Sequence, residues 1–289
     1  CLLSRGLGDV YKRQLLVVVA TFLFSSHDAL SKYLSGFYPI VWVVWARYLV
    51  HTLLMLGIFL PQAGLRGFRT QRPGLQVARA VCLLGCSLLF TKAVQYLPLA
   101  EATAVNFLAP LMVTALSMPL LKERVTRGQW VAVLASFIGV LIIVHPGGEL
   151  FTPAVLLPLG SATCFCFYQI FTRKLSEVDS PTVSNFFTGV FNTLAMSLLV
   201  PFFWTVPSLT HGLMTLALGT FGMLAHLFLT QAFRHAPPAL LAPFSYCQIV
   251  FAGLMGIVVF GQRPDLWGMI GIAVVCLSGL ATAWLQRRR

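Results

Sequence analysis

The stretch LLFTKAVQYLPLAEA, residues 88–102, decides the architecture, because its pattern returns as LFLTQAFRHAPPALL at residues 227–241. Leu, Thr, Ala, Pro and Ala recur at matching positions in the two copies. Continuing outward, LKER (121–124) aligns with FGQR (260–263), and Gly128 and Gly139 align with Gly268 and Gly279. A repeat of this length predicts two copies of one structural unit within the chain.

The composition indicates that the repeat lies in a membrane. Hydrophobic residues make up 58% of the 289 residues and charged residues only 10%, whereas soluble domains have about 45–50% apolar and about 25% charged residues. The net charge of +12 raises nucleic acid as a partner. The basic residues stand in short gaps between apolar runs, so we expect a lipid bilayer as partner and no nucleic acid.

The apolar runs predict an all-α polytopic membrane protein. A span needs about 20 mainly apolar residues, and ten stretches fit: 15–33, 38–60, 75–96, 99–121, 127–145, 152–173, 181–204, 210–233, 238–260 and 266–285. The repeat divides them into residues 15–146 and 150–285. Five spans are an odd number, so the second half starts on the opposite side of the membrane. The predicted fold is ten transmembrane helices as two inverted five-helix repeats, which is typical of secondary transporters.

The basic residues predict the orientation, because Lys and Arg accumulate in cytoplasmic loops. They cluster in alternate gaps: Arg66, Arg69, Arg72 and Arg79; Lys122, Arg124 and Arg127; Arg173 and Lys174; Arg234; and Arg287, Arg288 and Arg289. We therefore expect both termini in the cytoplasm and a multi-pass protein of a bacterial inner (plasma) membrane.

The first residues have a separate explanation. SRGLGDVYKRQ, residues 4–14, back-translates to a sequence similar to the transposon adapter used to prepare sequencing libraries. We expect residues 1–14 to be an adapter artefact; the alternative is a genuine polar arm.

Several motifs carry a family resemblance: HDALSKYL (27–34), WARYLV (45–50), the run from LPLAEATAV to IVHPG (97–147) and the run from AFRHAPP to SGLATA (232–283). Together they resemble the EamA-type ten-helix carriers of the drug/metabolite transporter superfamily over about residues 20–285. The resemblance implies alternating-access transport of a small solute. The family often has a Glu at the corner after the fourth helix of each half. Glu123 fits this pattern, but Gln262 stands at the matching position.

Ionisable residues inside spans are the first candidates for a site, because burying a charge in lipid is costly. Asp28, Lys32, Arg47 and Lys92 lie away from the gaps. Asp28 and Lys32 are spaced for a local ion pair. Arg47 either pairs with Asp28 or offers a cation to the solute, and Lys92 either snorkels or binds solute. Asp28 is also the proton-coupling candidate, with His27 a weaker one.

Proline-containing helices supply the second set of candidates. Pro110 and Pro243 interrupt helices that correspond in the two halves, and such segments often form transporter sites. Near them, Asn106 and Phe107 align with Ser245 and Tyr246, and the sixth helix adds Tyr168 and Gln169. Aromatic faces with a few polar groups suit an amphipathic organic solute. The alternative is ordinary polar packing between helices.

The predicted function is secondary transport of a small organic metabolite, whether an amino acid, a nucleoside-like compound or an amphipathic drug-like solute. DALSKYL (28–34) resembles S-adenosylmethionine carriers. A channel or scaffold and an intramembrane enzyme are the alternatives. H-E-x-x-H is absent from the sequence, and we predict no catalytic residues, metal or cofactor. The sequence leaves monomer and homodimer open.

Overall fold

The structure, a computed structural model, describes residues 2–63, 70–121, 126–145, 152–175, 178–235 and 244–287, and helices dominate these ranges. The α-helices are α1 (Leu2–Leu34), α2 (Ile40–Ala63), α3 (Pro73–Tyr96), α4 (Leu99–Asn106), α5 (Ala109–Leu121), α6 (Arg127–Ile143), α7 (Leu156–Leu175), α8 (Pro181–Ser197), α9 (Leu209–His235), α11 (Cys247–Phe260) and α12 (Leu266–Arg287). Two short 3₁₀ helices, η2 (Pro153–Val155) and η3 (Val200–Phe203), precede α7 and follow α8. Each of the ten predicted ranges overlaps at least one of these α-helices.

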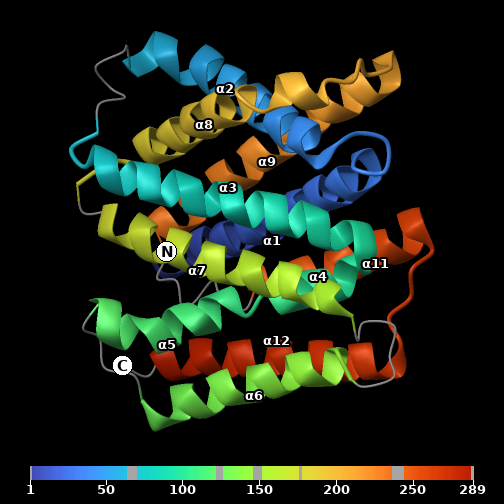
Figure 1. Ribbon diagram of the computed structural model, residues 1–289. Helices are drawn as coiled ribbons and strands as arrows, with labels where there is room; N and C mark the ends of the chain where they lie inside the picture. The colour runs from blue at the N-terminus through green and yellow to red at the C-terminus, as the bar shows by residue number, and fades with distance from the viewer. Residues whose placement is uncertain are drawn as a thin grey trace. The chain divides into compact units, whose positions relative to one another are not determined.

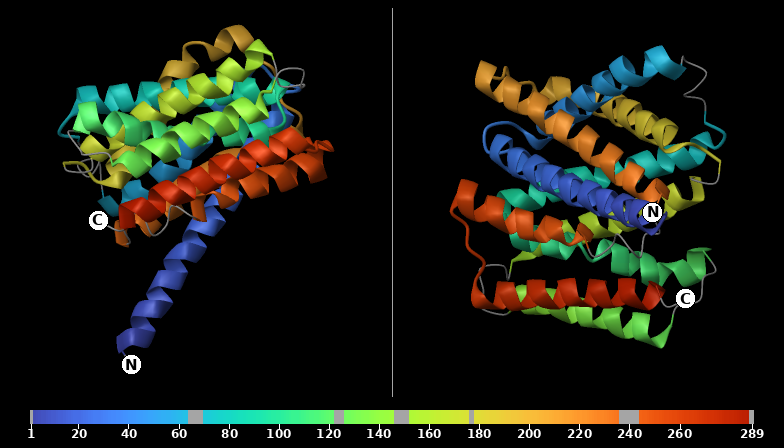
Figure 2. Two further views of the ribbon diagram at one scale, coloured as in Figure 1. Left: turned by 90° about the horizontal axis from the view of Figure 1, so that it is seen from below. Right: turned by 180° about the vertical axis from the view of Figure 1, so that it is seen from behind.

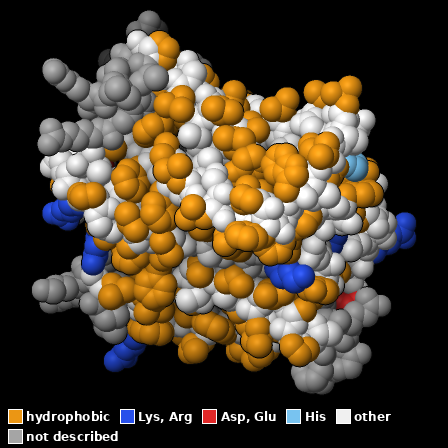
Figure 3. All heavy atoms as spheres, turned by 45° about the horizontal axis from the view of Figure 1, so that its top comes forward, with side chains coloured by type: hydrophobic (Ala, Val, Ile, Leu, Met, Phe, Trp, Pro, Cys, Tyr) orange, Lys and Arg blue, Asp and Glu red, His pale blue; other side chains and the backbone are white. Residues whose placement is uncertain are grey.

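Many of these helices have the length and composition of membrane spans. Six stretches qualify outright: Gln14–Leu34, Ile40–Phe59, Pro73–Tyr96, Leu99–Leu116, Pro153–Leu175 and Leu209–Leu229. Three shorter helical segments are also apolar: Arg127–Ile143, Cys247–Phe260 and Leu266–Ala281. Large apolar side chains are exposed, such as Leu141 at 69% and Val258 at 79%, and in Figure 3 hydrophobic side chains are spread across the described part of the face, interspersed with backbone and other side chains drawn in white. Such a surface suits lipid, so the chain is an all-helical polytopic membrane protein.

Local sequence explains where several helices begin and end. Thr126 and Gln129 form a reciprocal capping box at the start of α6. Ser180 caps α8, with Pro181 at the first helical position, where its missing N–H is harmless. Gly261 ends α11 in the left-handed conformation at φ 66°. The amide of Gln262 then donates to the Gly256 carbonyl at 2.9 Å, which closes the helix end.

The predicted fourth span, residues 99–121, consists of two helices in the structure. α4 ends at Asn106 and α5 starts at Ala109. Pro110 has no N–H to offer the Asn106 carbonyl, so the helical ladder is interrupted at this point. The break leaves Phe107 as the C-cap of α4. The corresponding Pro243 lies outside the described residues.

The helices form two compact units. The first unit contains residues 1–29, 98–152 and 224–289, and in it α6 and α12 run side by side (Figure 1). Their backbones meet at two glycines, because a Cβ on Gly271 would lie 2.6 Å from the Gly139 carbonyl oxygen. Small residues allow this close approach, which favours association of helices in lipid. Figure 2 shows from behind that α11 runs alongside α1, in agreement with the hydrogen bond from Ser25 to the Gln248 carbonyl at 2.9 Å.

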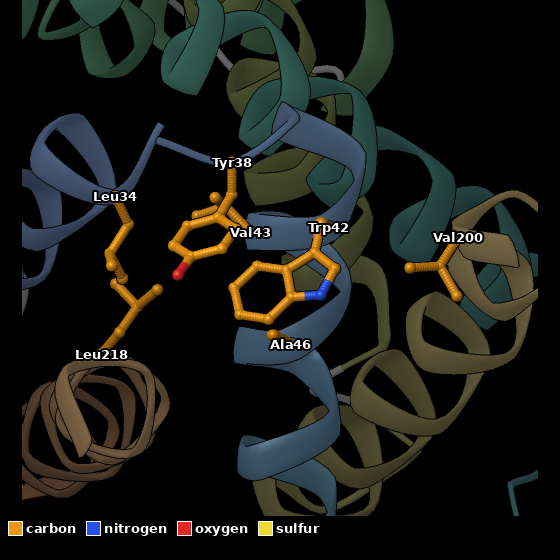
Figure 4. Close-up of a cluster of buried hydrophobic side chains, with 7 residues drawn as sticks. All are labelled: Leu34, Tyr38, Trp42, Val43, Ala46, Val200 and Leu218. Atoms are coloured by element: carbon orange, nitrogen blue, oxygen red, sulfur yellow. The ribbon is translucent and has the colours of Figure 1, made fainter. Parts of the chain in front are cut away.

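The second unit contains residues 30–97 and 153–223, so each unit draws on both predicted repeats. α3 and α7 lie side by side in it (Figure 1). One of its cores consists of Leu34, Tyr38, Trp42, Val43, Ala46, Val200 and Leu218. In Figure 4, Leu34 and Leu218 approach Tyr38 from α1 and α9, and the rings of Tyr38 and Trp42 stack with their centroids 4.6 Å apart. Aromatic packing thus joins the turn after α1 to α2 and α9.

Candidate functional site

Asp28 is the centre of a polar cluster between α1 and α11. Its side chain is buried, and its two carboxylate oxygens lie 3.0 Å from His27 Nδ1 and 3.3 Å from Gln248 Nε2. Ser25, one turn earlier on α1, donates to the Gln248 carbonyl. A buried carboxylate inside a span indicates a functional site, and this one has partners that fix its orientation.

A second acid lies in the same unit. Glu101 is in the first turn of α4 and is 3% exposed. A Cβ on Gly268 would lie 3.3 Å from Glu101 Oε1, so the carboxylate is beside the first turn of α12. The positive end of the helix dipole favours a negative charge there.

The two charged side chains that are buried in the described part of the first unit are both acidic. Among the described residues of this unit, Asp28 and Glu101 are buried, whereas no Lys or Arg side chain is. Arg127 is exposed at the start of α6. Asp28 and Glu101 therefore favour a cation in their immediate surroundings.

Two predicted site residues that correspond in the repeats come together in the first unit. The ring centroids of Phe107 and Tyr246 are 5.2 Å apart, with the planes inclined at 51°. Phe107 is at the break after α4, and Tyr246 immediately precedes α11. A Cβ on Gly279 would lie 1.6 Å from the Tyr246 hydroxyl, so the tyrosine occupies space that glycine leaves open. Asn106 and Ser245, beside this aromatic pair in sequence, are half-buried.

Lys32, another predicted site residue, caps a helix. Its ammonium group donates to the carbonyls of Val94 at 2.5 Å and Leu97 at 2.7 Å, at the end of α3. The last carbonyls of a helix have no partner within the helix, and a cation there also complements the helix dipole. Lys32 therefore connects the end of α1 to the end of α3.

Arg47 and Lys92 contact neutral side chains within the second unit. Arg47 donates from Nη2 to Ser87 at 2.6 Å and lies 4.5 Å from the centre of the Tyr48 ring. The ammonium group of Lys92 donates to Gln95 at 3.1 Å in an exposed contact and lies 4.8 Å from the centre of the Tyr96 ring. The exposed contact of Lys92 at the end of α3 suits a snorkelling lysine.

The structure shows one embedded cation that the sequence analysis assigned to a cytoplasmic gap. Arg79 is 1% exposed and is among the largest fully buried side chains. It donates to Thr172 and Tyr168 on α7 at 2.7 and 2.8 Å, and its other acceptors on α8 are the Ser184 carbonyl at 2.8 Å, Thr188 at 2.5 Å and Asn185 at 3.4 Å. The sequence signal was the spacing of four between Tyr168 and Thr172 and between Ser184 and Thr188, which places each pair on one helical face.

Tyr168, predicted to bind solute, is thus a partner of Arg79. Its hydroxyl accepts from Arg79 Nη2, and the guanidinium lies 4.5 Å from the ring centre. Gln169 is half-buried, and its side-chain amide has no hydrogen-bond partner among the residues that the structure describes. Tyr168 is therefore bound to Arg79, whereas Gln169 makes no hydrogen bond to a described residue.

Asp179, in the segment between α7 and α8, continues the Arg79 network. Thr70 donates to it at 2.5 Å, the Gln71 backbone amide at 3.1 Å and Gln76 at 2.9 Å. Burial acts to raise the pKa of Asp179, but these hydrogen bonds and the charge of Arg72 outweigh it and hold the pKa below its usual value.

Across the described residues, no group of three or more His, Cys, Asp and Glu side chains is arranged to hold a metal.

Comparison with known proteins identifies the family. The model of the EamA-like transporter family matches residues 12–145 and 152–284. Similar curated proteins include an S-adenosylmethionine uptake transporter of Rickettsia conorii (24% identical, 91% of this chain and 90% of the relative) and a riboflavin transporter of Vibrio cholerae (29%, 95% and 94%). A pseudopaline exporter, CntI, of Pseudomonas aeruginosa is 29% identical over 91% of this chain and 94% of its own.

The fold has a counterpart among solved structures. A crystal structure matches with a TM-score of 0.69 and 22% identity, over 96% of this chain and 99% of the other. The named relatives are transporters of small molecules, which points to a transporter rather than an enzyme. With the family model matching nearly its whole length, the chain belongs to the EamA-like transporter family, part of the drug/metabolite transporter superfamily.

Proposed function

We propose that this protein is an alternating-access carrier of an amphipathic organic cation, with S-adenosylmethionine as the first solute to test. The observation that carries the proposal is the buried carboxylate of Asp28, held by His27 and Gln248 in a unit whose other buried charged residue, Glu101, is also acidic. A solute with a positive charge gains from this field, whereas an anion is repelled.

The aromatic pair supplies the second part of the recognition. S-adenosylmethionine has a sulfonium cation and a planar purine. Phe107 and Tyr246 offer ring faces for the purine, and the amide of Asn106 and the hydroxyl of Ser245 offer hydrogen bonds close by in sequence. Aromatic walls with a few polar groups are the usual composition of a small-molecule site, and a cation gains further from aromatic faces.

Asp28 also serves as the coupling residue in this proposal. A carboxylate that binds the cationic group of the solute in one state and a proton in another exchanges solute for protons. His27 Nδ1, 3.0 Å from the carboxylate, is placed to accept that proton or return it. Coupled carriers accumulate solute when a proton gradient is applied, and a facilitator only equilibrates it.

The proposal assigns no solute contact to Lys32, Arg47, Lys92 or Tyr168. Each of them has a described partner in the second unit: carbonyls for Lys32, Ser87 for Arg47, Gln95 for Lys92 and Arg79 for Tyr168. Gln169 also receives no role. The proposed site therefore consists of Asp28, Asn106, Phe107, Ser245 and Tyr246.

The membrane arrangement is part of the same proposal. Ten spans in two inverted repeats, 15–146 and 150–285, place the basic gaps and both termini in the cytoplasm of a bacterial inner membrane. Support comes from the helices found in each predicted range and from the family match, which divides near residue 150. Site-specific labelling of cysteines introduced at residues 70 and 152 tests it, because the two should react from opposite sides.

The function is tested by counterflow in proteoliposomes that contain the purified protein. Vesicles preloaded with unlabelled S-adenosylmethionine should take up labelled S-adenosylmethionine with saturation, and preloading with riboflavin should not drive this uptake. A flux that does not saturate and shows no counterflow would indicate a channel. Saturable exchange of riboflavin but not of S-adenosylmethionine would refute the cation assignment and leave a carrier.

A further inference from the structure

Arg79 binds three helices together through its full set of hydrogen-bond donors. Nε donates to α7, Nη1 to two oxygens of α8, and Nη2 to both helices. The acceptors are themselves fixed, because the hydroxyls of Thr188 and Thr172 donate to the carbonyls of Ser184 and Tyr168. All five acceptors are neutral, and no ion pair of Arg79 with a carboxylate occurs among the described residues.

A second layer of polar contacts joins the same helices next to Arg79. Gln76, one turn before Arg79 on α3, is fully buried and donates to both Asp179 and Ser184 Oγ, at 2.9 and 3.0 Å. Asp179 in turn accepts from Thr70 and from the Gln71 amide, which precede α3. The segment before α3, the turn between α7 and α8, and the first turn of α8 are thereby connected.

Beyond Arg79, α3 and α7 pack closely through small residues. A Cβ on Gly85 would lie 3.2 Å from Cys164 Sγ, and a Cβ on Gly160 would lie 3.1 Å from Leu89. Between these points, Cys86 and Ser161 are 3.3 Å apart. The helices run antiparallel in one register from Arg79 to Leu89.

From these contacts we infer that α3, α7 and α8 move as one rigid block and that the contact between α3 and α7 stays closed throughout the transport cycle, with Arg79 as the residue that positions the block. Separating α3 from α7 would strip the guanidinium and its acceptors of their partners in an apolar environment, which is strongly unfavourable. The inference rests on the proposed function for the existence of a transport cycle. The opening that admits solute must then lie at other helix contacts.

A disulfide between α3 and α7 tests this directly. Gly85→Cys would place a new Cβ 3.9 Å from the Cβ of Cys164, within the usual separation of about 3.5–4.5 Å for a disulfide. The other cysteines are replaced by Ala, and the control is the same protein with Cys164→Ala as well. After oxidation we expect no loss in the initial rate of S-adenosylmethionine or riboflavin counterflow relative to the reduced protein.

A rate that is lost on oxidation and restored by reductant, in the paired variant alone, overturns the inference. Failure of the proposed function is distinguishable, because then the wild-type protein also transports neither solute. In that case the rigid block is tested by amide hydrogen exchange, a measurement that needs no solute. Amide hydrogen exchange of wild-type protein should be slow at residues 76–83, 168–173 and 184–189, whereas Arg79→Gln should speed exchange in all three segments and Arg79→Lys should restore part of the protection.

Lys92→Gln is the matched control for the exchange experiment, since Lys92 lies on the same helix in an exposed contact. It should leave the three segments unchanged. If Arg79→Gln accelerates exchange in α3 alone, or if the wild-type segments already exchange rapidly, α3, α7 and α8 are not one block.

Discussion

The guanidinium of Arg79 lies over the ring of Tyr168 and also donates to its hydroxyl, so that one side chain from α3 holds one from α7 by two different interactions. The stacking distance is 4.5 Å from the guanidinium carbon to the ring centre, and the hydrogen bond is 2.8 Å. A planar guanidinium can stack on a ring and also direct five N–H groups at fixed acceptors, whereas an ammonium is a compact point charge with three donors. The pair therefore depends on arginine in particular.

Arg79→Gln should destabilise the protein by about 3 kcal/mol, because it leaves several buried acceptors without a donor. Arg79→Lys should lose less, since an ammonium retains the charge and part of the hydrogen bonding. Thermal unfolding in detergent, followed by helix content, measures both variants against wild type. Equal thermal midpoints for wild type and Arg79→Gln would contradict a stabilising role for the hydrogen bonds of Arg79.

Asp28→Asn should reduce S-adenosylmethionine counterflow by about tenfold or more, because a hydrogen bond to a charged group contributes about 1.5–3 kcal/mol. The amide is nearly isosteric with the carboxylate, so insertion and helix content should be preserved. Ser26→Ala is the control on the same helix, since the hydrogen bond of Ser26 among the described residues runs back to the Phe22 carbonyl. Accumulation of solute driven by a proton gradient should also disappear in Asp28→Asn. If it persists, Asp28 is not the proton-coupling residue.

Gly279→Ala should weaken solute binding and also destabilise the folded protein by about 1–3 kcal/mol, the usual range for overpacking. Its new methyl group would occupy the position of the Tyr246 hydroxyl, at 1.6 Å, and so displace the tyrosine from Phe107. We expect a higher KM for S-adenosylmethionine counterflow when equal amounts of folded protein are compared. Tyr246→Phe in combination with Gly279→Ala should not restore the affinity, because Cζ and Cε1 of the ring would still lie 1.9 and 2.7 Å from the new Cβ. Full recovery would show that the added methyl group does not act by displacing the ring.

Gly271→Ala should destabilise the α6–α12 pair by about 1–3 kcal/mol, the usual range for overpacking. The added Cβ would be 2.5 Å from Ile143 and 2.6 Å from the backbone oxygen of Gly139. Gly57→Ala provides the matched control, since a Cβ at Gly57 meets nothing within 4 Å and alanine in a helix is favoured over glycine by about 0.5–1 kcal/mol. Thermal midpoints should therefore move in opposite directions.

Asp179 predicts a pH dependence of stability. Its pKa is lower in the folded protein than in the unfolded chain, where the value is about 3.9, so the folded state binds fewer protons in that window. The stabilisation is fully present above the unfolded pKa and is lost as the pH falls through the folded pKa. Wild type should exceed Asp179→Asn in thermal midpoint at pH 7, and the difference should shrink below about pH 4. A difference that is constant down to pH 3 would contradict this.

Much of the secondary structure could be predicted because it depends on local patterns. The apolar run of residues 75–96 predicted a helix that the structure places at Pro73–Tyr96, and the run 266–285 predicted α12 at Leu266–Arg287. Their length and composition fix a helix in lipid, where every backbone group must be bonded within its own segment. The break at Phe107 was less clear, because the sequence shows Pro110 but not whether the helix bends or stops there.

The candidate site was predictable in part. Sequence correspondence between the repeats selected Phe107 and Tyr246, whose rings meet in the structure. The approach of His27 and Gln248 to Asp28 could only be partly foreseen, since Gln248 is distant in sequence. Lys32 could not be recognised as a cap for α3, because its acceptors, the carbonyls of Val94 and Leu97, belong to another helix.

The sequence by itself determined that the chain is helical, lies in a membrane and repeats its own pattern, since these properties follow from hydrophobicity, helix length and residue spacing. Only the tertiary structure decided which polar side chains form hydrogen bonds to other parts of the protein. Arg79 shows the reason: its position near the start of a helix is consistent with a solvated cytoplasmic cation or a buried one. The choice depends on whether acceptors such as Thr172 and Thr188 are brought within reach by helices from elsewhere in the chain. Desolvation and hydrogen bonding are set by neighbours in space, which the order of residues alone does not specify.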